Sequence, residues 1–204
     1  MGRKLEQEVK FYLPDPQAFE KRLQASGASL KQPRMLETNL RFDTPDRRLS
    51  KSFQVLRLRQ DKLCRLTWKG AGDSAGEVSA REELEVTVSD LETARAILEG
   101  LGFEEMLVYE KYRSAWMLGE VEISLDEMPF GHFCEVEGPD IESIKNAAAL
   151  LALDWEKRST LSYLALFNNL KEKQGLTMRD LTFDSFKEIK VELRDLGFEA
   201  SSAD

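Results

Sequence analysis

Two pairs of like-charged residues, each spaced two positions apart, could carry metal and phosphate chemistry. Glu6 and Glu8 form an acidic pair, and Arg57 and Arg59 form a basic pair. Side chains two apart on a strand point to the same face, so each pair concentrates charge of one sign. Clustered carboxylates suit a hard divalent cation, and clustered guanidinium groups suit phosphate oxygens. Together the two pairs describe a site for a metal-bound triphosphate.

The pairs lie within segments that alternate charged and apolar side chains, which is the pattern of a β-strand with two different faces. In residues 5–11, Glu6, Glu8 and Lys10 share one face, and apolar residues share the other. The same sorting recurs later in Arg57 and Arg59; Arg65, Thr67 and Lys69; Arg81, Glu83 and Glu85; Lys111 and Arg113; Glu122, Ser124 and Asp126; and Glu135 and Glu137. Each segment is therefore predicted to be a strand with one charged face.

The whole pattern predicts about eight strands and several helices. The strands are expected near residues 5–11, 34–43, 53–60, 63–70, 80–88, 103–117, 119–127 and 132–138. Helices are expected from the Asp15 cap to Ser26-Gly27, from the Asp90 cap to Gly100, and from Pro139-Asp140 to about Leu153. Residues 161–204 suggest a two-helix appendage broken at Gly175, with residues 200–204 disordered.

Alternation does not say which face of the sheet is the interior, because a half-buried sheet also alternates. A solvated charged face usually mixes Lys, Glu, Thr, Gln and Ser, whereas these positions favour same-sign Arg and Glu pairs. If the sheet closes with its charged faces inward, the amphipathic helices can cover the apolar outer faces. From the residues alone, both arrangements stay open.

Composition limits the partners. The 204 residues suit one compact domain, and 29 Lys and Arg against 37 Asp and Glu give a net charge of −8. Such a surface should repel nucleic acid and anionic lipid, so a phosphate site must be local. The absence of a long apolar run or an apolar leader predicts a cytoplasmic protein.

The cysteines and the single histidine are expected to be structural. Cys64 and Cys134 lack CxxC spacing and have only His132 as a further metal-binding type, so a disulfide framework or a zinc site is not expected. Both thiols are predicted to be buried and inert. Alternation places His132 on the outward face, away from the charged pairs.

The segment Glu6-Gln7-Glu8-Val9-Lys10 resembles the ExExK signature of the CYTH family, also called triphosphate tunnel metalloenzymes, which includes class IV adenylyl cyclases and thiamine triphosphatases. Six further matches follow in the family's order, over residues 5 to about 165. They are Phe42-Asp43-Thr44-Pro45-Asp46, Leu56-Arg57-Leu58-Arg59, Thr67-Trp68-Lys69-Gly70, Arg81-Glu82-Glu83-Leu84-Glu85, Glu110-Lys111-Tyr112-Arg113 and Gly131-His132-Phe133-Cys134-Glu135-Val136-Glu137-Gly138. Arg41 departs from the pattern, because the family often has Tyr there.

The resemblance implies an α+β fold: an eight-stranded antiparallel closed β-barrel with a charged lumen and helices packed outside. Residues 1–170 would form this tunnel domain, and residues 171–204 a helical appendage of the same domain. It implies Glu6, Glu8, Glu135 and Glu137 as metal ligands, and Lys10, Arg57, Arg59, Lys69, Arg81, Lys111 and Arg113 as triphosphate ligands. Lys10, Lys111 and Glu85 are the candidates for catalysis, while Glu83, Glu122 and Asp126 are further lumen candidates.

The expected activity is hydrolysis of a triphosphate with Mg²⁺ or Mn²⁺, acting on inorganic tripolyphosphate, thiamine triphosphate or a nucleoside triphosphate. One alternative is a class IV adenylyl cyclase that makes cyclic AMP and pyrophosphate. Another is a noncatalytic module that binds polyphosphate or nucleotides. The expected partner is a small-molecule triphosphate, with no nucleic acid and no membrane, in a monomer or homodimer.

Overall fold

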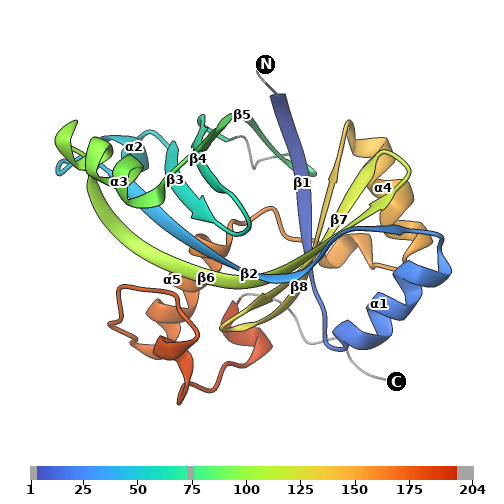
Figure 1. The fold of residues 1–204 in the computed structure, drawn as a ribbon. Helices are drawn as coiled ribbons and strands as arrows, with labels where there is room; N and C mark the ends of the chain where they lie inside the picture. The colour runs from blue at the N-terminus through green and yellow to red at the C-terminus, as the bar shows by residue number, and fades with distance from the viewer. Residues whose placement is uncertain (1–3, 73–75, 197–204) are drawn as a thin grey trace.

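The computed structural model describes residues 4–72 and 76–196, and eight antiparallel strands in it form a closed barrel (Figure 1). The strands are β1 (Lys4–Tyr12), β2 (Ser29–Asp43), β3 (Val55–Gln60), β4 (Cys64–Lys69), β5 (Ser79–Val88), β6 (Glu104–Leu118), β7 (Val121–Met128) and β8 (Gly131–Gly138). Their order around the barrel is β1-β5-β4-β3-β2-β6-β7-β8, and β8 pairs with β1 to close it. The predicted fold class and strand count are confirmed.

Strand β2 begins at Ser29, earlier than the predicted residue 34. The prediction missed its first residues because they pair irregularly with β6. The register shifts between Leu30 and Gln32 and again between Gln32 and Met35, where Pro33 has no amide hydrogen to donate. These irregular positions lack the clean alternation on which the prediction relied. Figure 1 shows β2 and β6 as the two long curved strands that sweep across the molecule.

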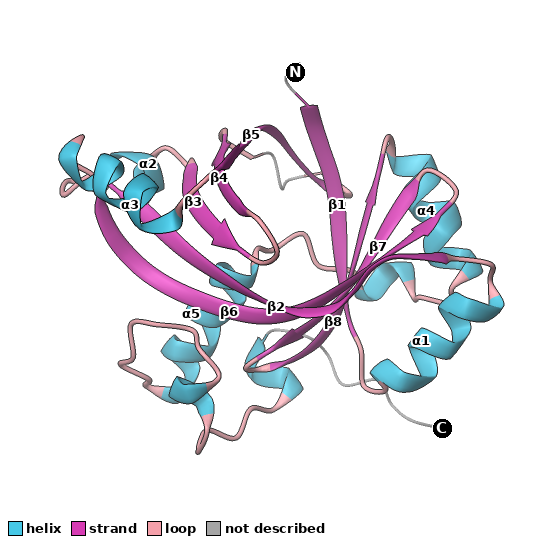
Figure 2. Ribbon diagram, in the orientation of Figure 1, coloured by secondary structure: helices cyan, strands magenta, loops and turns pink. Residues whose placement is uncertain are grey.

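The helices lie outside the sheet (Figure 2). They are α1 (Pro16–Ala25), α2 (Arg48–Lys51), α3 (Leu91–Gly100), α4 (Ile141–Leu150) and α5 (Tyr163–Gln174). Side chains of Asp15, Asp90 and Asp140 accept hydrogen bonds from backbone amides at the starts of α1, α3 and α4. These three helices begin where the caps predicted, whereas the short helix α2 was not predicted.

The apolar faces of most strands point outward and are covered by helices. Val9 of β1 and Val136 of β8 are fully buried against α1 and α4, in one cluster with Leu23 and Ile144. On the other side of the barrel, α3 packs on β3 and β6, and its Leu98 joins a buried cluster with Leu40 of β2 and Leu58 of β3. The charged faces are therefore inside, which decides the question that alternation left open. The outer face of β5 lacks such cover, since Leu84 and Val86 remain exposed.

The tail differs from the predicted two-helix appendage. Helix α5 forms, but within described residues 176–196 the only helical elements are two 3₁₀ turns, Asp184–Phe186 and Leu193–Leu196. Leu181 exchanges backbone hydrogen bonds with Val108 and Glu110 of β6, at 2.9 Å each. This pairing requires an extended backbone, which overrides the helical spacing of the apolar residues. Residues 200–204, predicted to be disordered, lie outside the described residues.

A buried carboxylate at the end of β2 anchors helix α2. Asp43 is 1% exposed, and its oxygens accept hydrogen bonds from the amides of Thr44, Leu49 and Ser50 and from the Ser50 hydroxyl. Burial alone would raise the pKa of Asp43, but the bonds from Ser50, Leu49 and Thr44 outweigh it and lower the pKa below its ordinary value.

We expect Asp43→Ala to reduce the free energy of unfolding by about 3 kcal/mol at pH 7, because it leaves several buried donors without an acceptor. A carboxylate with a lowered pKa stabilises the fold above its ordinary pKa, and that stabilisation is lost as the pH falls through the lowered value. The difference in the free energy of unfolding between wild type and variant should therefore become smaller below about pH 4. Urea denaturation at pH 7 and pH 3 measures both differences, and an unchanged difference would contradict this account.

Candidate active site

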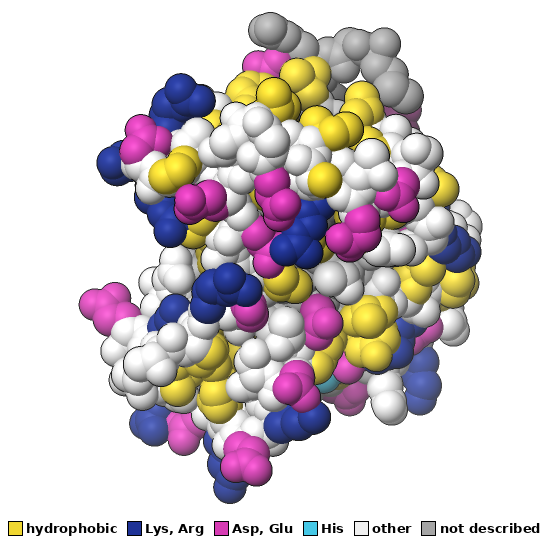
Figure 3. All heavy atoms as spheres, turned by 60° about the vertical axis from the view of Figure 1, so that its left-hand side comes forward, with side chains coloured by type: hydrophobic (Ala, Val, Ile, Leu, Met, Phe, Trp, Pro, Cys, Tyr) yellow, Lys and Arg dark blue, Asp and Glu magenta, His cyan; other side chains and the backbone are white. Residues whose placement is uncertain are grey.

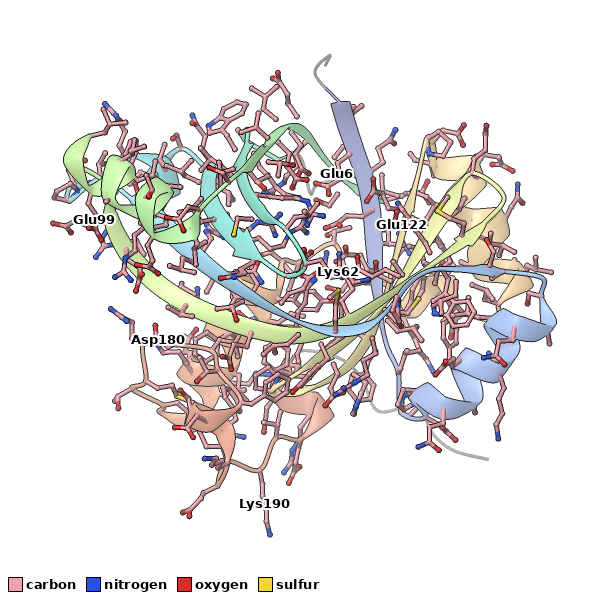
Figure 4. The ribbon with its side chains drawn as sticks, viewed as in Figure 1. Glu6, Lys62, Glu99, Glu122, Asp180 and Lys190 are labelled. Atoms are coloured by element: carbon pink, nitrogen blue, oxygen red, sulfur yellow. The ribbon has the colours of Figure 1, made fainter. Side chains whose placement is uncertain are left out.

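The interior of the barrel is a cavity of about 1130 Å³ with charged walls. Every residue predicted for the site lines it: Glu6, Glu8, Lys10, Arg57, Arg59, Lys69, Arg81, Glu85, Lys111, Arg113, Glu135 and Glu137. In Figure 4, Glu6 and Glu122 lie close to β1 in the middle of the molecule, whereas Glu99 and Lys190 lie at its outer edge. On the face shown in Figure 3, Lys and Arg side chains lie beside Asp and Glu side chains near the centre.

One wall of the cavity concentrates guanidinium groups. Arg57 of β3 stands directly opposite Arg41 of β2, and Arg59 follows two residues later on the same face. Burial is the main reason that the pKa of Arg41 and of Arg59 lies below the ordinary value, and the charge of Arg57 lowers both further. Like charges directly across two strands are destabilising. Despite its burial, Arg57 itself has a raised pKa because of Tyr109, Glu83 and Glu37, so nearby groups compensate part of the positive charge that an anion would neutralise.

The same wall holds hydrogen-bond donors without acceptors. Arg57 Nη1 donates to the hydroxyl of Tyr109 at 3.1 Å, and Arg59 Nη2 donates to Glu85 at 3.1 Å. The Nε atoms of Arg57 and Arg59 are buried, and within the described parts of the chain neither has a hydrogen-bond partner. Unpaired buried donors are costly, so they mark places where a ligand oxygen fits.

The opposite wall holds a row of carboxylates. Glu137 of β8 stands across from Glu8 of β1 on one side and across from Glu122 of β7 on the other. Burial raises the pKa of Glu8, and the charges of Glu135 and Glu6 add to the rise, while Lys10 opposes it. Oxygen donors gathered in this way fit a hard divalent cation of the Mg²⁺ class. Glu122, which sequence analysis left outside the metal set, stands in this row beside Glu137.

In the structure these carboxylates pair with lysine and arginine. Glu6 accepts from Lys69 at 2.5 Å, and Glu8 accepts from Lys10 at 2.5 Å. Glu135 lies 2.9 Å from Arg113 and 3.3 Å from Lys10. Among residues 4–72 and 76–196, no three Asp, Glu, His or Cys side chains lie close enough together to hold a metal ion. The structure therefore gathers the predicted ligands on one wall, with Glu6, Glu8 and Glu135 each paired with a basic side chain.

A buried network joins the two walls and includes Tyr163, a residue that sequence analysis missed. Asp126 is 1% exposed and accepts hydrogen bonds from Lys111 Nζ at 3.1 Å, Arg113 Nε at 2.6 Å and the Tyr163 hydroxyl at 2.7 Å. The ammonium groups of Lys10 and Lys111 lie 5.4 and 5.3 Å from the centre of the Tyr163 ring. Tyr163 thus contacts two cations of the cavity and the predicted lumen residue Asp126, which is buried behind the lining and does not itself line the cavity.

Tyr163 begins α5, so the C-terminal segment is part of the cavity wall. Ser159, just before this helix, exchanges backbone hydrogen bonds with Lys10 of β1 at 2.9 and 2.7 Å. Nothing in the strand alternation indicates a lumen residue on a helix. By contrast, the alternation in predicted strands 34–43 and 103–117 would have found Glu37 and Tyr109, which share faces with Arg41 and Lys111.

The three candidates for catalysis differ in their surroundings. Glu8 and Glu135 raise the pKa of Lys10 despite its burial, so Lys10 retains its proton and suits phosphate binding better than proton abstraction. Glu85 accepts hydrogen bonds from Arg59 and from the Thr67 hydroxyl, so it orients the Arg59 side chain. Lys111 lies between Asp126 and Glu37, at 3.1 and 3.8 Å. Which group activates water stays a prediction.

His132 and the cysteines do not line the cavity. His132 is half-buried on the outward face of β8, and its backbone carbonyl accepts from Leu13 at 2.9 Å. Both thiols are free; Cys134 is fully buried, and burial raises its pKa. Cys64 is only half-buried, which corrects the prediction that both are buried. Cys64 is the first residue of β4.

We expect His132→Ala to keep triphosphate turnover within about twofold of wild type, because substitutions away from buried networks usually have small effects. Steady-state kinetics of the purified variant, with circular dichroism to check folding, tests this. A large loss of activity in a folded variant would show that the facing of β8 is wrong.

Of the helices within residues 4–72 and 76–196, none has the length and the apolar character needed to cross a membrane.

Three comparisons with known proteins show what this chain is similar to. A family model described as CYTH domain matches residues 4–164. Adenylate cyclase CyaB of Aeromonas hydrophila is 28% identical over 179 residues, which cover 80% of this chain and 88% of that protein. Two solved structures share the fold, and both are described as proposed adenylate cyclases. That of Vibrio parahaemolyticus has a TM-score of 0.70 and 24% identity, covering 82% of this chain and 99% of the other.

The second, HpAC1 of Hippeastrum, is described as revealing a dominant triphosphatase activity. Its TM-score is 0.59 at 22% identity, with 85% of this chain and 97% of the other covered.

Proposed function

Because the chain belongs to the CYTH domain family, we propose that it is a divalent-metal-dependent enzyme that hydrolyses the terminal phosphoanhydride of a triphosphate. The observation that carries this proposal is the pair of buried Arg57 and Arg59 Nε donors, which have no hydrogen-bond partner among the described residues and lie across one cavity from the Glu8–Glu137–Glu122 row. A polyanion alone would need only the basic wall. A metal-bound triphosphate needs both walls.

The proposed phosphate ligands are the cavity's basic side chains. Arg57 and Arg59 offer forked donors, and Arg41 adds a third guanidinium beside Arg57. Lys10 and Lys69 would turn from their carboxylates to phosphate oxygens once a cation occupies the acidic wall. The remaining members are Arg81, Lys111 and Arg113.

The proposed metal ligands are Glu6, Glu8, Glu135 and Glu137, to which we add Glu122. A bound Mg²⁺ or Mn²⁺ would neutralise charge on phosphate oxygens as the bridging bond breaks. Among the four predicted ligands, Glu135 is the weakest candidate, because its oxygens already pair with two cations, Arg113 at 2.9 Å and Lys10 at 3.3 Å. If the ion pair of Glu135 with Arg113 persists when metal binds, Glu122 takes the place of Glu135 in the metal set.

The reaction asks little more of the protein than this positioning. A water oxygen attacks the terminal phosphorus, the bond to the bridging oxygen breaks, and orthophosphate, a diphosphate product and a proton are released. The basic wall stabilises charge on the leaving diphosphate. No covalent enzyme intermediate is required.

Cyclisation of ATP is the second candidate, and the name of the Aeromonas hydrophila relative favours it. The ribose 3′ hydroxyl would then attack the α-phosphorus in place of water. The description of HpAC1, in which triphosphatase activity dominates, favours hydrolysis in a protein of the same fold. We rank hydrolysis first because it needs only the charged walls.

Product analysis by ³¹P NMR tests the proposal. The purified protein is incubated with tripolyphosphate, thiamine triphosphate and ATP in turn, each with Mg²⁺ and with Mn²⁺. We expect orthophosphate and a diphosphate product that depend on the metal. Cyclic AMP with pyrophosphate would make the protein a cyclase, and tight binding without turnover would make it a noncatalytic binding module.

A further inference from the structure

Phe53 adopts a backbone conformation that disfavours a bulky residue. Its φ is 57°, in the left-handed region, where the sequence predicted the start of a strand. It follows α2 and forms a Schellman motif: its amide donates to the Ser50 carbonyl at 3.1 Å, and the Gln54 amide donates to the Leu49 carbonyl at 2.8 Å. Glycine usually occupies this position, because the Cβ of any other residue there lies too close to the following carbonyl oxygen.

The surroundings hold this backbone in place without using the Phe53 ring. Asp43 binds the Leu49 and Ser50 amides on one side, and Gln54 Oε1 accepts from Trp68 on the other. The ring itself is 75% exposed, so it contributes little to the apolar packing of the described residues. Glycine would be more stable than phenylalanine at this position, so stability does not explain the exposed ring.

The position of the Phe53 ring suggests what it does. Phe53 lines the same cavity as Arg57, and the four residue steps from one to the other span at most about 14 Å. Val55, the first residue of β3, lies between them on the cavity wall. The ring therefore stands at the edge of the cavity, one short organic group away from the basic wall.

We propose that Phe53 determines specificity by stacking on the aromatic ring of an organic triphosphate whose phosphates lie against Arg57 and Arg59. The inference rests on the proposed function and narrows it to triphosphates that carry an aromatic heterocycle. A nucleobase and the rings of thiamine share this chemistry, whereas inorganic tripolyphosphate lacks it. Stacking of a base on an aromatic side chain is strong enough to select such substrates.

The test compares KM and kcat for ATP, thiamine triphosphate and tripolyphosphate in wild type, Phe53→Ala and Phe53→Tyr. We expect Phe53→Ala to raise KM about tenfold for one or both organic substrates, with kcat nearly unchanged. Tripolyphosphate kinetics should stay within about twofold, and Phe53→Tyr should behave as wild type. The organic substrate that responds identifies the ring.

Two further variants separate stacking from stability. Phe53→Gly also removes the ring but relieves the strained backbone, so it should raise the melting temperature and still raise KM as Phe53→Ala does. Leu101→Ala removes another exposed apolar side chain, 70% exposed and outside the cavity, and should leave every substrate unchanged.

An equal effect on tripolyphosphate and on both organic substrates would overturn the inference, and so would no effect on any of them. If no substrate is hydrolysed, the proposed function fails separately. Calorimetric binding then decides the inference: weaker binding of ATP or thiamine triphosphate, but not of tripolyphosphate, to Phe53→Ala supports it, and equal binding overturns it.

Discussion

Glu137→Gln is expected to lower metal-dependent turnover at least about 100-fold without unfolding the protein. Glu137 is the middle member of the acidic row, across from both Glu8 and Glu122. Replacing its carboxylate with an amide of the same shape removes one charge from the row. The variant should bind the metal more weakly, because the remaining carboxylates offer fewer anionic oxygens to a hard cation.

Metal binding gives a readout besides activity. Titration with Mn²⁺, followed by electron paramagnetic resonance, should show weaker binding to Glu137→Gln than to wild type. The thermal stability of the metal-free variant should not fall, because the substitution relieves repulsion among like charges. Glu99→Gln is the matched control, since Glu99 lies on helix α3 at the edge of the molecule and pairs with Arg95 at 3.1 Å. Wild-type metal affinity in Glu137→Gln would refute the acidic site.

Arg57→Ala is expected to weaken triphosphate binding by about 2 kcal/mol or more, which is about 30-fold in affinity. Arg57 is buried in the basic wall, opposite Arg41, and its Nε donor has no partner among the described residues. A phosphate oxygen would accept a hydrogen bond from that Nε, so the variant loses a charge-assisted hydrogen bond in a desolvated setting. Removing the guanidinium relieves repulsion on Arg41 but also removes the hydrogen bond to the Tyr109 hydroxyl, so circular dichroism should check that the variant is folded.

Calorimetric titration with tripolyphosphate in the absence of divalent metal measures this binding without turnover. Arg57→Lys should lie between wild type and Arg57→Ala, because lysine keeps the charge but not the fork of donors. Arg179→Ala is the control, since the Arg179 side chain is 59% exposed and lies outside the cavity. Equal affinity in Arg57→Ala and wild type would show that phosphate does not bind this wall.

Much of the fold follows from local rules, and those parts were predictable. Asp15, Asp90 and Asp140 cap their helices through amides three residues away, so a short stretch of sequence contains both partners. Alternation likewise separates Glu8 from Val9 within one strand. Where local rules failed, a distant partner intervened: Leu181 is extended because β6 offers its backbone groups, despite helical spacing around it.

The sequence by itself determined which residues share a strand face, and resemblance of its motifs to a family indicated that the charged face is the interior. Only the tertiary structure decided which charges meet. Closure of β8 on β1 sets Glu137 across from Glu8, and pairing of β2 with β3 sets Arg41 across from Arg57. The docking of α5 brings Tyr163 to Asp126. These contacts join residues far apart in the chain, and no periodicity within one segment can encode them, because strand register and helix docking depend on the packing of the whole barrel.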